Sequence, residues 1–156
     1  MKGERMGNID VKIIKLNPMR AASFYGFGSS PEIEAHAAAR EWLTEHDLIK
    51  PNAFRNFGFN NPNPSAGSPN YGYEVWIAPT IGFPENHGAK VVEFSGGLYA
   101  VAFCPSLDVI GQMWQKLVAW RDSSEYDRAH HQWLEELHNP WEFTVDRFDL
   151  SLPIKE

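Results

Sequence analysis

The alternation of apolar and polar residues along the chain predicts a protein rich in β-strands. Short apolar or alternating segments, bounded by Gly, Pro and Asn, suit strands rather than long helices. They lie at residues 11–16, 21–27, 54–59, 71–77, 91–94, 98–104, 133–137 and 148–154. The two segments on either side of Ser95-Gly-Gly97 predict a β-hairpin. Residues 60–70 and 79–88 are predicted loops, and residues 1–8 a loose leader.

Two further segments have the apolar spacing of amphipathic helices. The first begins with Ser30 as N-cap and Pro31 in the first helical position, and ends near residues 46–47. The second is expected to be capped by Asp108. The apolar positions, three or four residues apart, are Ala35, Ala38, Ala39, Trp42 and Leu43 in the first helix and Ile110, Met113, Trp114, Leu117 and Trp120 in the second.

The two halves of the chain repeat the same order of elements. A shift that places Ser30 on Asp108 also places Trp42 on Trp120, and each half then has the order β-α-β-β. Chance alignment of two amphipathic helices is the alternative, but the shared order and Trp position favour a duplication. We therefore predict an α+β fold in a single domain over residues 9–156, with halves of about 9–80 and 89–154. One antiparallel sheet would carry both helices on one face, with a ligand groove between pseudo-twofold halves.

Composition narrows the function. The 156 residues are 43% hydrophobic, which is too apolar for a disordered chain, and the net charge of -6 argues against sequence-independent nucleic-acid binding. Cys104 is the only cysteine, so no intramolecular disulfide forms, and no apolar stretch is long enough to span a membrane. These features predict a cytoplasmic protein without a membrane or direct nucleic-acid partner.

Common motifs of catalysis and metal binding are absent. His130 and His131 are adjacent and lack the spacing of a zinc site, and Cys104 lies in an apolar strand where a thiol is usually a buried small hydrophobe. There is no nucleophile elbow and no glycine-rich phosphate loop. We therefore expect no metal and no cofactor.

The carboxylates of Glu135 and Glu136 are more informative. Side chains alternate along a strand, so one of these two must point towards an apolar surface. A carboxylate there is costly unless it is paired, and it is a candidate for binding a cation or for acid-base chemistry. A solvated edge strand is the alternative. Glu74 raises the same question more weakly.

Aromatic residues form 13% of the chain, including six Trp and five Tyr. Several are hard to place in one small core, and Tyr and Trp suit pocket walls because they keep a polar tip. Aromatic rings around a carboxylate would hold a lipophilic cation through charge and cation-π attraction. The acidic net charge fits such a ligand.

In their order and spacing, five segments resemble the GyrI-like small-molecule-binding domain. This is also the effector-binding domain of AraC-type and MerR-type multidrug regulators. The segments are Tyr71-Gly-Tyr-Glu-Val-Trp-Ile77, Gly96-Gly-Leu-Tyr-Ala-Val101, the helix from Trp114 to Trp120, Leu134-Glu-Glu136, and Phe148-Asp-Leu-Ser-Leu-Pro-Ile154. The resemblance covers residues 9–154 and implies a fold made of two strand-helix-strand-strand modules.

The resemblance also implies a groove that takes hydrophobic, often cationic compounds, with a glutamate at its base. By its motif this glutamate is Glu135, although the aromatic residue usual two places later is Leu137 here. The groove walls then map onto Tyr73, Trp76, Tyr99 and Trp114. Few residues lie outside the resemblance, so we expect a stand-alone form without the helix-turn-helix domain of the regulators.

Three functions follow as hypotheses. The first is a stand-alone protein that binds lipophilic or cationic small molecules, with Glu135 as the charge anchor. The second is a hydrolase of strained electrophilic toxins, with Glu135 as the catalytic acid-base residue in the same groove. The third is a protective protein that interacts with DNA gyrase. We favour the first.

Overall fold

The computed structural model describes residues 9–144 and 146–155, so the predicted leader at 1–8 lies outside the described residues. The chain forms two compact units. Unit 1 contains the described residues up to Pro18, then Ser95–His138 and those from Thr144 onwards. Unit 2 contains Met19–Phe94 and Asn139–Phe143. Each unit therefore combines segments that are distant in the sequence.

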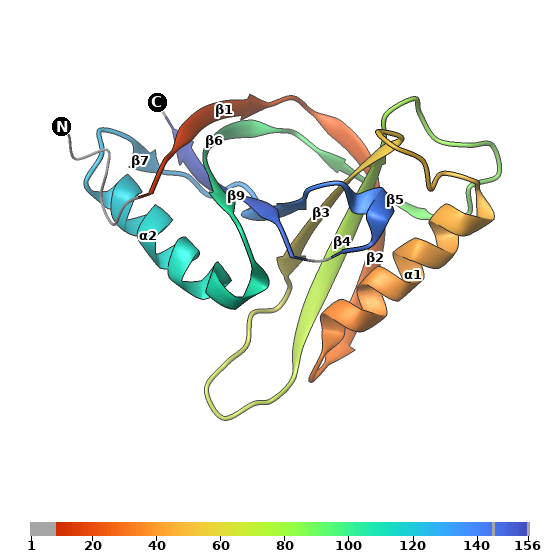
Figure 1. Cartoon of the computed structure of the whole chain (residues 1–156), viewed down its shortest axis with the longest axis horizontal. Helices are drawn as coiled ribbons and strands as arrows, with labels where there is room; N and C mark the ends of the chain where they lie inside the picture. Colours follow the sequence, from red (N-terminus) through yellow and green to blue (C-terminus); the bar gives the residue numbers. More distant parts are fainter. Residues whose placement is uncertain (1–8, 145, 156) are drawn as a thin grey trace. The chain divides into compact units, whose positions relative to one another are not determined.

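Unit 2 is a four-stranded antiparallel sheet with one long helix (Figure 1). The strand order is β3-β4-β2-β5, and helix α1 packs on β2 and β4. The elements are β2 (Met19–Gly28), α1 (Pro31–Glu45), β3 (Phe54–Asn60), β4 (Tyr71–Pro79), β5 (Lys90–Phe94) and the short 3-10 helix η3 (Pro140–Glu142).

Unit 1 repeats this arrangement with the strand order β1-β6-β9-β8, and helix α2 packs on β6 and β9. A two-residue strand, β7, pairs with the end of β9. The elements are β1 (Lys12–Leu16), β6 (Gly97–Cys104), the 3-10 helix η2 (Leu107–Val109), α2 (Ile110–Asp122), β7 (Asp127–Arg128), β8 (Leu134–Leu137) and β9 (Phe148–Lys155).

The predicted α+β class is confirmed. The described residues hold nine strands, paired antiparallel in both units, and two α-helices. The order β2-α1-β3-β4 in unit 2 matches the order β6-α2-β8-β9 in unit 1, with β7 as an addition. Within the described part of the chain, neither helix has the length and apolar character needed to span a membrane.

The predicted β-hairpin between residues 91–94 and 98–104 is wrong, although both strands exist. β5 pairs with β2 in unit 2, whereas β6 pairs with β1 and β9 in unit 1. A strand has only two edges, and those of β6 are both occupied. Gly96 has a φ of 82°, and a Cβ there would lie 2.3 Å from the Leu16 carbonyl oxygen. Glycine therefore fits the passage from β5 to β6.

The apolar face predicted for the first helix is largely confirmed. Ala35, Ala39, Trp42 and Leu43 are buried against the sheet of unit 2, but Ala38 is exposed. Ser30 occupies the predicted N-cap position without a side-chain capping hydrogen bond, and the helix ends at Glu45.

In the second helix the predicted cap is wrong. Asp108 lies within η2, and Val109 is the N-cap residue of α2. The apolar side is as predicted, because Leu117 and Trp120 are buried and Ile110, Met113 and Trp114 pack against the same core.

Candidate ligand-binding site

Glu135 lies on the side of the unit 1 sheet that α2 covers. On β8, Glu135 is opposite Leu150 and Leu137 is opposite Phe148. Leu137, Phe148 and Leu150 belong to the buried cluster that packs against Leu117 and Trp120 of α2. Directly paired residues share a face of the sheet, so Glu135 is on this helix side and Glu136 on the reverse side. The alternation predicted from the sequence is therefore confirmed.

Two indole rings accompany the Glu135 carboxylate. The Nε1–H of Trp114, from α2, donates a hydrogen bond to Glu135 Oε2 at 3.1 Å. The ring centroids of Trp114 and Trp133 are 5.3 Å apart, and Trp133 is 42% exposed. Glu135 and Trp114 are half-buried. These three residues, here called the Glu135 site, combine a negative charge with an accessible aromatic surface.

The negative charge of Glu135 affects the pKa of the neighbouring Cys104 thiol. Burial raises the pKa of Cys104, a backbone hydrogen bond at Ser106 partly offsets this rise, and the negative charge of Glu135 adds to it. The thiol is fully buried and donates to the Ser106 carbonyl oxygen at 3.1 Å. Burial and the nearby negative charge therefore both favour the protonated form of the Cys104 thiol.

Tyr99 lies on the reverse face of the same sheet. Its neighbour Ala100 pairs with Leu152 in the α2 cluster, so Tyr99 points to the other side. Its hydroxyl donates to the Gln132 carbonyl oxygen at 2.5 Å, and its ring packs edge-on against His131. Burial raises the pKa of the Tyr99 hydroxyl. The structure thus gives Tyr99 a structural hydrogen bond away from Glu135.

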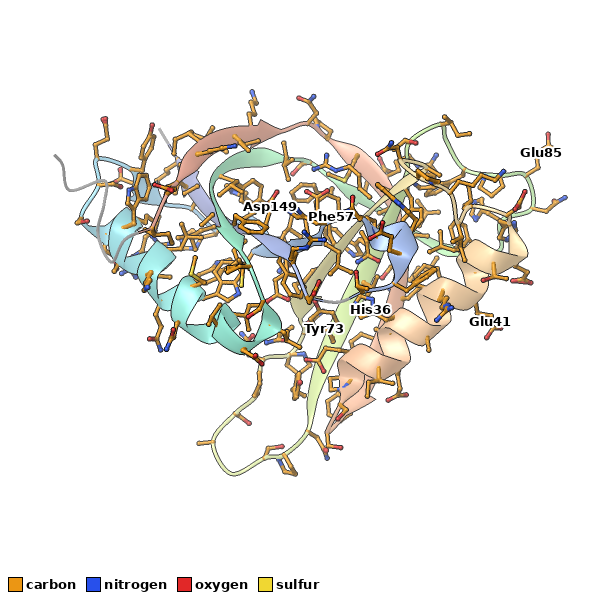
Figure 2. All side chains as sticks on the ribbon, viewed as in Figure 1. His36, Glu41, Phe57, Tyr73, Glu85 and Asp149 are labelled. Carbon is orange, nitrogen blue, oxygen red and sulfur yellow. The ribbon has the colours of Figure 1, made fainter. Side chains whose placement is uncertain are left out.

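Tyr73 belongs to the core of unit 2 beneath α1. Its ring centroid is 5.9 Å from that of His36 on α1, and Figure 2 labels both side chains. The ring crosses Gly58 of β3, where a Cβ would lie 2.1 Å from the Tyr73 hydroxyl. Burial lowers the pKa of His36, and the negative charge of Glu32 partly offsets this.

Trp76 lies three positions after Tyr73 on β4 and so points to the opposite face. Its Nε1–H donates to Glu74 Oε2 at 2.6 Å, and its ring packs edge-on against Phe59 at 4.8 Å. Of the expected site residues in unit 1, Glu135 and Trp114 lie in one cluster and Tyr99 lies on the other face of the sheet, whereas Tyr73 and Trp76 belong to unit 2. Tyr99, Tyr73 and Trp76 have the separate surroundings described above.

Trp133 was not among the residues predicted for the groove, although the structure places its ring against Trp114. The signal was present, because Trp133 is two positions before Glu135 and alternation places both on one face. The centroid of the Trp114 ring lies 5.3 Å from that of the Trp133 ring, so the two indoles form an aromatic pair.

Two of the histidines predicted to be structural, His131 and His138, each contact a protein oxygen. His131 Nε2 is 2.8 Å from the Leu98 carbonyl oxygen, and His138 Nε2 is 2.9 Å from Asp149 Oδ1, whose side chain is labelled in Figure 2. In residues 9–144 and 146–155, no three His, Cys, Asp or Glu side chains are grouped so that they could hold a metal ion.

The family of the chain follows from its sequence. Residues 9–155 match the model of the GyrI-like small molecule binding domain. The chain belongs to this family. No curated protein gives a significant sequence match.

Solved structures of low sequence identity share the fold. The EcmrR C-terminal domain is 10% identical, with a TM-score of 0.64 over 95% of this chain and 98% of that one. A hydrolase from Listeria innocua is 11% identical, with a TM-score of 0.62 over 93% and 91%. SAV2435 bound to tetraphenylphosphonium is 11% identical, with a TM-score of 0.54 over 94% of both chains. At these identities the likeness shows the fold alone.

Proposed function

We propose that this GyrI-like domain binds hydrophobic organic cations at the Glu135 site. The observation that carries the proposal is the half-buried Glu135 carboxylate, which accepts a hydrogen bond from Trp114, whose ring in turn contacts the exposed Trp133. Two comparisons support the proposal. The family is one of small-molecule-binding domains, and the structure of SAV2435, which has the same fold, contains an organic cation, tetraphenylphosphonium.

The physical basis is the combination of charge and aromatic surface. A carboxylate that is partly removed from water attracts a cation more strongly than an exposed one, because the surrounding dielectric constant is lower. The indole faces attract a cation by about 0.5–2 kcal/mol and bury its apolar groups. The hydrogen bond from Trp114 fixes the carboxylate, so that less side-chain entropy is lost when a ligand binds.

Thermal unfolding with tetraphenylphosphonium, and with neutral triphenylphosphine oxide as a comparison, tests the proposal. A ligand present at ~100 times its dissociation constant stabilises the folded state by about 2.7 kcal/mol. We expect stabilisation by the cation and little by the neutral compound. Glu135→Gln should abolish the effect of the cation, whereas Glu136→Gln, with the same change of charge on the reverse face, should preserve it. Equal stabilisation of both variants would contradict the proposal.

Hydrolysis is the second candidate function, favoured by the likeness to the Listeria innocua hydrolase. Glu135 would take a proton from water as the water oxygen bonds to an electrophilic ring carbon. The strained carbon-carbon bond would break and its electron pair would receive the proton. Ring-opened product formed by the wild type but not by a folded Glu135→Gln variant would support it. The interaction with DNA gyrase stays a prediction.

A further inference from the structure

We propose that the outer edge of β1 in unit 1 binds an acidic, extended segment of a partner protein, which adds a strand to the sheet. Among the described strands, β1 pairs with β6 alone, and Figure 1 shows it beside that strand. The other edge of β1 therefore presents backbone N–H and C=O groups that have no strand partner in the described part of the chain. Such an edge is a template for strand addition.

The side chains of β1 are accessible on both faces of the sheet, because its first four residues are exposed. Ile13 is 39% exposed and Ile14 is 38% exposed. Ile13 is paired with Ala100 and so lies on the α2 side, whereas Ile14 is paired with Tyr99 on the reverse side. An added strand would therefore cover one apolar side chain on each face.

The charges of β1 select the kind of partner. Lys12 and Lys15 are three positions apart, so one ammonium group lies on each face. Within residues 9–144 and 146–155, neither lysine forms an ion pair. The β1 strand of a second copy would bring two more lysines and be repelled, whereas a strand with acidic residues opposite Lys12 and Lys15 would be attracted.

The register defines a suitable probe. An antiparallel strand meets Lys15, Ile14, Ile13 and Lys12 in that order, which calls for an acidic, two apolar and an acidic residue. The hexapeptide Thr-Glu-Val-Val-Glu-Thr, acetylated and amidated at its ends, has this order. Its valines and threonines are β-branched and favour an extended conformation.

A ¹⁵N–¹H NMR titration of the protein with this hexapeptide tests the proposal. We expect saturable shifts of the β1 amides and none of the amides of β5, the edge strand of unit 2. Lys12→Gln and Lys15→Gln should each weaken binding about twofold to fivefold, because each removes one exposed ion pair. Lys90→Gln, the same change at an exposed lysine of β5, should leave the affinity as in the wild type.

Two N-methylated peptides separate strand pairing from charge attraction alone. The N–H groups of successive residues in a strand point to opposite edges, so only every second one faces β1. One peptide is methylated on the backbone nitrogens of its second and fourth residues, and the other on those of its third and fifth. Both keep the same charge and composition, yet one should bind at least about tenfold more weakly than the other.

The proposal is overturned if the hexapeptide does not shift the β1 amides, if the two methylated peptides bind with equal affinity, or if Lys12→Gln and Lys15→Gln bind like the wild type. A second copy is the other possible occupant of this edge. Shifts of the β1 amides with protein concentration, in the absence of peptide, would show that a second copy binds there and would also overturn the proposal.

Discussion

At the scale of single residues, the strand register determines which side chains meet. The sequence already placed Glu135 and Glu136 on opposite faces, and the pairing of β8 with β9 shows that Glu135 faces α2. The same alternation separates Tyr73 from Trp76, because strand residues whose numbers differ by an odd value, here three, point to opposite faces. The contact of Trp114 with Glu135 was beyond prediction, since it depends on how α2 packs on the sheet.

The stability of the protein should fall as the solution is acidified through the range where His36 titrates. Burial lowers the pKa of His36 in the folded state below its ordinary value of 6.5. The unfolded chain therefore binds this proton at a higher pH than the folded chain does, and the free energy of unfolding decreases as pH falls below about 6.5. Urea unfolding between pH 7.5 and pH 5 measures the slope.

His36→Gln should flatten that slope, whereas His130→Gln, a change at an exposed histidine, should leave it as in the wild type. A wild-type slope retained in His36→Gln would show that other groups cause the acid sensitivity.

At the scale of elements, the local sequence pattern predicted the positions of most strands and of both helices, but it did not predict every strand pairing. The Ser30-Pro31 start and the apolar spacing predicted α1 well, because these features act within one helix. The hairpin prediction failed because it assumed that strands joined by a turn pair with each other. β6 instead lies between β1 and β9, which no local pattern around Ser95-Gly-Gly97 encodes.

Gly58→Ala should destabilise unit 2 by about 1–3 kcal/mol, because the new Cβ would lie 2.1 Å from the Tyr73 hydroxyl. The matched control is Gly111→Ala in α2, where nothing lies within 4 Å of a Cβ. This control should be neutral or stabilising by up to about 1 kcal/mol. Urea denaturation provides both values.

A double-mutant cycle with Tyr73→Leu isolates the cause. The Gly58→Ala cost should shrink in the Tyr73→Leu background, because the obstructing ring is gone. If the losses of unfolding free energy in Gly58→Ala and Tyr73→Leu simply add in the double variant, the Gly58→Ala penalty does not come from the Tyr73 ring.

At the scale of the whole molecule, each unit contains the first strand of the other half of the sequence. β1 precedes the first β-α-β-β module but pairs with β6 of unit 1, and β5 precedes the second module but pairs with β2 of unit 2. The two halves inferred from the sequence therefore exchange one strand each in the folded chain. We therefore expect the folding of the two halves to be coupled.

Neither half should fold alone. A fragment of residues 1–82 lacks β5 and carries β1 without its partner, and a fragment of residues 83–156 has the converse defect. We expect little amide dispersion in NMR spectra of either fragment and a folded spectrum when the two are mixed in equal amounts. A dispersed, native-like spectrum from the first fragment alone would show that the exchanged strands are dispensable.

The most direct test of the account is the response of the Trp114 indole N–H, which donates to Glu135, to tetraphenylphosphonium. We predict a saturable shift of its NMR signal in the wild type and in Glu136→Gln, with binding at least about tenfold weaker in Glu135→Gln. A Trp114 signal that does not move, or equal affinity in Glu135→Gln and the wild type, would contradict the assignment of Glu135 as the charge that holds the ligand.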